Sequence, residues 1–266
     1  MKEEGALRLI DDAADVVGRL PEWVGLLWLS AMPARLLLAF LWIRLIELGP
    51  EAVHYGDWVR RMAWLLLLAW LGSLWGRQVF VGACRHALQS ERPAPRALLR
   101  VPTREMAGHL AAALAVEVLF WALLPTLVAP LFLLVPAGLA AAAAPSGGPG
   151  PLESLRALWR GIGPVGRLIR LVLLFAVLVP VAAINLHFFA GALIWLAGGV
   201  ASFDVTGWRR VLDWGVPSYR VLLLIGALLL LEPVWLAALT VHVERVRARG
   251  TGDDLRRWFA ELRAAG

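Results

Sequence analysis

The sequence predicts an all-α protein, a polytopic transmembrane helical bundle with about six spans. Of its 266 residues, 60% are hydrophobic and only 17% are charged, whereas soluble domains have about 45–50% apolar and about 25% charged residues. Several apolar stretches reach the roughly 20 residues that a helix needs to cross a bilayer. The composition excludes a disordered chain and argues against a soluble enzyme.

Six stretches are predicted to span the membrane: residues 23–48, 62–84, 106–124, 128–144, 168–200 and 219–243. The third and fourth divide one apolar run, 106–145, which is twice the length of a single span. Pro125 and Pro130 lie in the middle of that run, where a tight turn is expected. Pro33, Pro180 and Pro233 offer breaks inside three other spans.

The distribution of basic residues supports this layout. With six spans, 19 of the 26 basic residues fall on the side that holds both ends of the chain, and 6 fall on the opposite side. Because basic loops remain in the cytoplasm, both ends are predicted to be cytoplasmic. All basic residues except Lys2 are arginines, which suggests a bacterial, GC-rich source and hence the bacterial inner (plasma) membrane.

Three segments follow from this layout. Residues 1–21 form a cytoplasmic amphipathic helix, 22–243 the six-span membrane domain, and 244–266 a second cytoplasmic amphipathic helix. In the first helix, Leu7, Ile10, Ala14, Val17 and Leu20 form an apolar stripe. In the second, the stripe consists of Leu255, Trp258, Phe259 and Leu262.

Two short basic segments suggest an internal repeat. Residues 96–100 (RALLR) recur as 156–160 (RALWR), each on the predicted cytoplasmic side before an outward-going span. The repeat units would be 92–145 and 152–203; the alternative is two unrelated juxtamembrane segments. Four arginines, together with the C-terminal stripe, are candidate contacts for a partner or the membrane surface: Arg96, Arg100, Arg156 and Arg160.

Polar residues inside apolar spans are costly and usually face the interior of a bundle. The candidates for an intramembrane polar site are Glu117, His109, Asn185, His187, Glu232 and Arg35. Glu117 must be protonated or paired at mid-span, and Arg35 is a candidate partner. The alternative is that these side chains form interhelical hydrogen bonds that only fix the packing.

No catalytic, cofactor-binding or metal-binding constellation emerges from the sequence. There is no phosphate-binding Gly-rich loop, no HExxH, no GxSxG and no CxxC pattern, and Cys84 is the single cysteine. The basic residues follow the membrane layout, so nucleic acid is not expected as a partner.

Two stretches resemble a group of bacterial six-span membrane proteins. They are 90–100 (SERPAPRALLR) and the end of the last span, 243–250 (VERVRARG) followed by 253–255 (DDL). The group includes the membrane domain of some glycerophosphodiester phosphodiesterases and stand-alone relatives, some encoded beside AAA+ ATPases of the MoxR type. His242 or one of its neighbours stands where the group has Tyr, and Glu244 stands where it has Asp. The resemblance implies a helical membrane domain without catalytic residues.

Two functions are therefore expected. The first is a non-enzymatic integral membrane subunit that scaffolds or anchors other membrane or cytoplasmic proteins in a bacterial cell-envelope complex. The alternative is a small transporter or lipid-handling protein that uses the intramembrane polar residues. The lipid bilayer is a partner in both cases.

Overall fold

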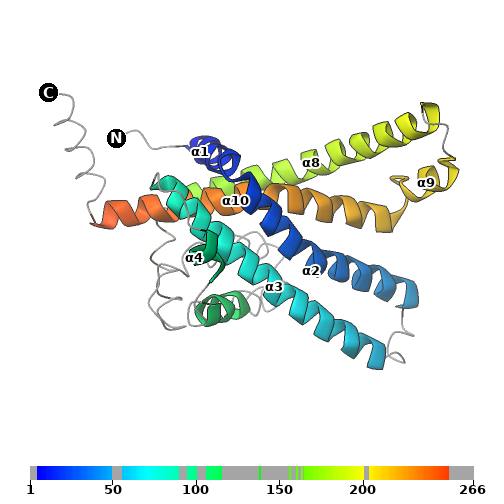
Figure 1. Cartoon of the computed structure of the whole chain (residues 1–266). Coiled ribbons are helices and arrows are strands. Elements are labelled where there is room, and N and C mark those ends of the chain that lie inside the picture. The colour runs from blue at the N-terminus through cyan, green and yellow to red at the C-terminus, as the bar shows by residue number, and fades with distance from the viewer. Residues whose placement is uncertain are drawn as a thin grey trace. The chain divides into compact units, whose positions relative to one another are not determined.

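A computed structural model describes residues 5–49, 56–89, 95–100, 106–115, 138, 156, 160, 163, 165–200 and 204–251. Every secondary-structure element in these residues is helical (Figure 1). The helices are α1 (Ala6–Gly18), α2 (Pro21–Leu48), α3 (Gly56–Leu88), α4 (Pro95–Leu99), Met106–Ala115, α8 (Val165–Gly199), α9 (Thr206–Val211) and α10 (Pro217–Thr251).

Within the described residues, four helices are long and apolar enough to cross a membrane: α2, α3, α8 and α10. Many of their large apolar side chains are exposed, such as Leu29, Trp64 and Trp195. In the most apolar stretches of α2 and α8 only 28% of the residues are buried. Such surfaces would be unstable in water and suit a lipid environment. The chain is therefore a membrane-embedded helical protein.

The spans expected at 23–48, 62–84, 168–200 and 219–243 coincide with these four helices. The third expected span begins with the apolar helix Met106–Ala115. Its remainder and the expected fourth span lie outside the described residues, as do the turn and most of the first repeat unit, 92–145.

The expected breaks at proline are not found, because Pro33, Pro180 and Pro233 all lie inside continuous helices. Membrane helices tolerate proline where other groups satisfy the freed carbonyl. The boundary expected at 243/244 also falls within a helix, since α10 continues without interruption to Thr251.

The chain divides into two compact units, each of which includes part of all four long helices. Unit 1 comprises Met1–Leu27, Leu74–Leu173 and Pro233–Gly266, and unit 2 comprises Trp28–Ser73 and Leu174–Glu232. In unit 1, helix α1 buries Ala6, Leu9, Ala13 and Val16. Within this helix the expected stripe is wrong by one position: Leu7 is 68% exposed, whereas Leu9 is fully buried. Only its last member, Leu20, which follows the helix, is buried as expected.

In unit 2, helices α8 and α10 pack through small residues. Ala183 of α8 and Ala227 of α10 belong to one buried cluster with Tyr219 and Leu223. A Cβ added to Gly226 would lie 3.2 Å from Cδ1 of Leu186. Small side chains let two helix backbones approach closely, which is how membrane helices gain packing energy without a hydrophobic effect between them.

Candidate functional site

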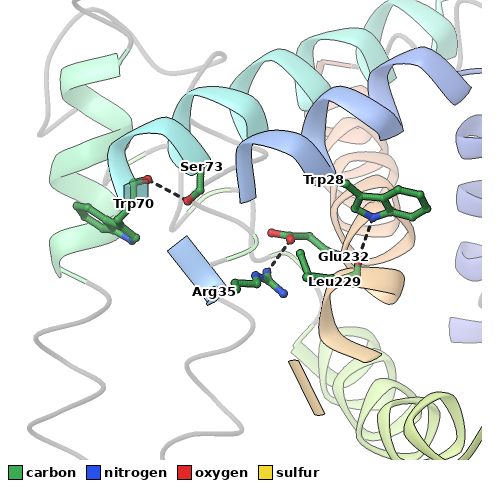
Figure 2. Close-up of polar contacts among 6 residues, drawn as sticks. All are labelled: Trp28, Arg35, Trp70, Ser73, Leu229 and Glu232. Carbon is green, nitrogen blue, oxygen red and sulfur yellow. Dashed lines mark hydrogen bonds and ion pairs between the residues drawn. The ribbon is translucent and has the colours of Figure 1, made fainter. Parts of the chain in front are cut away.

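An ion pair joins α2 and α10 inside unit 2. The Arg35 Nη2 atom donates to Oε2 of Glu232 at 2.6 Å, and the two side chains are 20% and 5% exposed (Figure 2). Burying either charge alone would be costly, so the pair makes both tolerable in an apolar bundle. Glu117, for which Arg35 was the expected partner, lies outside the described residues.

A second polar contact joins the same two helices close to the ion pair (Figure 2). The indole Nε1 of Trp28 donates to the main-chain oxygen of Leu229 at 2.8 Å. Leu229 lies four residues before Pro233, which has no N–H to donate back along the helix. The tryptophan therefore supplies the hydrogen bond that the proline removes.

Asn185 and His187 both lie on α8 but make different contacts. Asn185 is exposed, and its Nδ2 donates to the main-chain oxygen of Val181, one turn earlier. The Nδ1 atom of His187 lies 3.0 Å from the hydroxyl of Tyr219 on α10. The His187 ring also packs edge-on against Trp214, with the centroids 5.3 Å apart. Asn185 thus bonds within its own helix, whereas His187 contacts α10 and Trp214.

His109, the remaining candidate in this set, lies on the helix Met106–Ala115 of unit 1 and is 1% exposed. Of the six candidates, the structure brings Arg35 and Glu232 into direct contact, within unit 2.

No group of three or more metal-binding side chains occurs in the part of the chain that the structure describes.

Charged residues form a second constellation, in unit 1, that sequence analysis missed. Arg245 of α10 pairs with Asp12 of α1. Glu244 lies 2.7 Å from Nη2 of Arg85 on α3 and 3.7 Å from Nη1 of Arg247. These pairs link α1, α3 and α10. In the sequence, these helices show only that acidic and basic residues recur along them. This pattern does not predict which acid pairs with which arginine.

These ion pairs border a polar hollow of about 560 Å³ in unit 1. It is lined by residues of α1 and the Arg19 that follows it, by three residues at the end of α3 with the Gln89 that follows them, and by the C-terminal part of α10. This volume falls within the range of small-molecule sites. The described lining of the hollow includes none of the six intramembrane candidates.

The expected surface contacts are described only in part. Arg100, Arg156 and Arg160 are exposed. Arg96 lies in α4, but the position of its side chain is not described. The C-terminal stripe of Leu255, Trp258, Phe259 and Leu262 lies outside the described residues, so its role stays a prediction.

Comparison with known proteins does not assign the chain to a family. No protein-family model matches the chain, and searches of curated proteins and of solved structures found no match. The functional argument therefore rests on the residues and contacts described above.

Proposed function

We propose that the protein is a non-enzymatic, multi-pass membrane subunit that anchors or scaffolds partner proteins. One observation carries this proposal. Several polar side chains inside the described spans bond within their own helices or to neighbouring ones, as in Arg35–Glu232 and His187–Tyr219. By contrast, the arginines of the short juxtamembrane segments, Arg156 and Arg160, are exposed. The exposed arginines outside the spans are therefore better placed to bind a partner protein than the paired charges inside them.

The proposed setting is the bacterial inner membrane, with six spans and both ends in the cytoplasm. The distribution of basic residues supports it, because a single span over 106–145 would place the arginines of 153–170 outside. Exposed arginines on the cytoplasmic side can contact acidic proteins or anionic headgroups. Amphipathic segments at the two ends would extend this contact surface.

This topology can be mapped with single cysteines. The only native cysteine, Cys84, is buried. A Cys84→Ala chain therefore has no thiol of its own that could react with the label. Ser146→Cys and Ser154→Cys should react with a membrane-impermeant maleimide only from the cytoplasmic face, and Gly56→Cys only from the opposite face. Labelling of Ser154→Cys and Gly56→Cys from the same face would exclude the six-span arrangement.

The anchoring function is tested by crosslinking in native membranes followed by mild extraction and mass spectrometry. We expect partners in stoichiometric amounts, confirmed by reciprocal capture, and their loss in the charge-reversed variant Arg156→Glu/Arg160→Glu. The matched control is Arg60→Glu/Arg61→Glu, which reverses two exposed arginines of α3. Recovery of an isolated chain under all conditions would overturn the proposal.

The alternative function, a small transporter or lipid-handling protein, makes a different prediction. Glu117→Gln should abolish its activity while leaving folding and expression intact, because a proton- or solute-binding carboxylate cannot be replaced by an amide. A Glu117→Gln chain that supports growth and partner capture like the wild type would leave anchoring as the function.

A further inference from the structure

The polar hollow in unit 1 carries both signs of charge. Among the described residues that line it, four are arginines: Arg19, Arg85, Arg245 and Arg247. Three are carboxylates: Asp12, Asp15 and Glu244. The remaining described lining is Gln89 and small or aliphatic side chains, without an aromatic ring. A ligand that fits this lining must satisfy cationic and anionic groups at once.

The hollow lies at the ends of two candidate spans. Its lining includes Leu88, the last residue of α3, and Gln89, which follows it. It also includes Glu244, Arg245 and Arg247, in the last two turns of the candidate span that ends at Arg249. Span ends lie at the depth of lipid headgroups. Polar lipid headgroups are therefore present at high concentration where this hollow is placed.

The chemistry of the lining selects among headgroups. Guanidinium groups bind phosphate oxygens through charge-assisted hydrogen bonds. Carboxylates repel a purely anionic ligand but accept hydrogen bonds from a primary ammonium group. A quaternary ammonium group has no N–H to donate and is recognised by aromatic cages, which the described lining does not provide.

We propose that the hollow binds a phosphate ester that carries a primary ammonium group, of the phosphoethanolamine type. Its phosphate contacts the arginines of α3 and α10, and its ammonium group contacts the carboxylates of α1. The ligand has two sources, the headgroup of a phosphatidylethanolamine lipid or a soluble phosphoethanolamine, and both share this chemistry.

The test is lipid retention by the purified full chain. The chain is incubated with equal amounts of phosphatidylethanolamine, phosphatidylglycerol and phosphatidylcholine, and bound lipid is counted by native mass spectrometry. We expect retention of phosphatidylethanolamine to exceed that of the other two by roughly three-fold to ten-fold, the range for one hydrogen bond of typical net strength. Equal retention of the three lipids, or a preference for phosphatidylglycerol, would overturn the proposal.

Two variants at the rim of the hollow identify the site. Asp15 and Arg247 have side chains that are 78% and 48% exposed, so Asp15→Asn and Arg247→Gln should fold. Each should reduce the preference for phosphatidylethanolamine several-fold. The control Arg60→Gln removes an arginine of another exposed pair, which forms with Asp57 at 2.6 Å. A loss in the control as large as in the rim variants would refute the assignment.

A competition arm distinguishes the two ligand sources. Soluble phosphoethanolamine at millimolar concentration is added to the lipid-loaded chain. If the lipid is displaced, the site binds the headgroup alone. If the lipid persists, the site binds the membrane lipid together with its acyl chains. If neither the lipid nor the soluble ester is retained, the hollow is not a site for this chemistry.

Discussion

The indole N–H of Trp28 satisfies the main-chain carbonyl of Leu229, 201 residues away in sequence (Figure 2). This carbonyl would bond to the N–H of residue 233 in an uninterrupted α-helix. Residue 233 is proline, and α10 still continues through it. In a bilayer an unsatisfied carbonyl is unfavourable, so a side chain on α2 compensates for a proline in α10.

This relationship predicts a conditional effect of removing the indole N–H. Trp28→Phe keeps a ring of similar shape and should destabilise the folded protein by about 1 kcal/mol, the usual strength of a polar contact between membrane helices. The free energy of unfolding is measured by titration with a denaturing detergent. In a Pro233→Ala chain the new N–H bonds to Leu229, and the cost of Trp28→Phe should fall close to zero.

The control is Trp64→Phe, which alters an exposed ring on α3. Its effect should be within about 0.5 kcal/mol in both backgrounds. If Trp28→Phe costs the same free energy of unfolding in the wild-type and the Pro233→Ala backgrounds, Trp28 does not compensate for the proline.

The ion pair between Arg35 and Glu232 predicts strong non-additivity. Arg35→Met or Glu232→Gln alone leaves one buried charge without this partner and should cost about 3–5 kcal/mol. The double variant should cost clearly less than the sum, because it removes both charges. The same detergent titration measures all three. The control Arg60→Gln, at an exposed pair, should cost at most about 1 kcal/mol. If the losses of Arg35→Met and Glu232→Gln simply add in the double variant, the two side chains do not form a direct pair.

The sequence was sufficient to predict the helices and much of their extent, because apolar runs of about 20 residues are a strong signal. It was not sufficient to predict partners. Arg35 and Glu232 are 197 residues apart, and nothing in either local pattern links them. The same holds for Arg245 and Asp12, whose pairing depends on how α1 and α10 pack in unit 1.

Helix α1 shows a finer limit of sequence patterns. Its apolar residues form two overlapping stripes, one through Leu7 and Ile10 and one through Ala6 and Leu9. The stripes differ by one position, or about 100° around the helix. Periodicity predicts the helix equally well with either stripe. The face that is buried depends on contacts with the rest of unit 1, including the pair between Asp12 and Arg245.

A matched pair of truncations tests which face of α1 is buried. Leu9→Ala removes a fully buried side chain and should lower the free energy of unfolding by about 2–5 kcal/mol. Leu7→Ala alters a side chain that is 68% exposed and should change it by no more than about 0.5 kcal/mol. The detergent titration compares them, and a larger loss for Leu7→Ala would restore the stripe expected from sequence.

The segment between α8 and α10 contains an acid-sensitive turn. Oδ1 of Asp204 accepts a hydrogen bond from the main-chain N–H of Thr206, the first residue of α9, at 3.0 Å. This bond, together with one from the Thr206 side chain, holds the pKa of the exposed Asp204 carboxyl below its usual range. Because the pKa is lower in the folded turn, the carboxylate stabilises the turn at neutral pH, and this contribution is lost as the pH falls below about 4.

Hydrogen exchange at the Thr206 amide measures this effect directly. After correction for the intrinsic rate, protection of the wild-type amide should be constant near neutral pH and should fall as the pH is lowered below about 4. Asp204→Asn keeps an acceptor oxygen but does not titrate, so its protection should be independent of pH. Constant wild-type protection down to about pH 2, well below the usual carboxyl range, would show that the charge on Asp204 does not hold the start of α9.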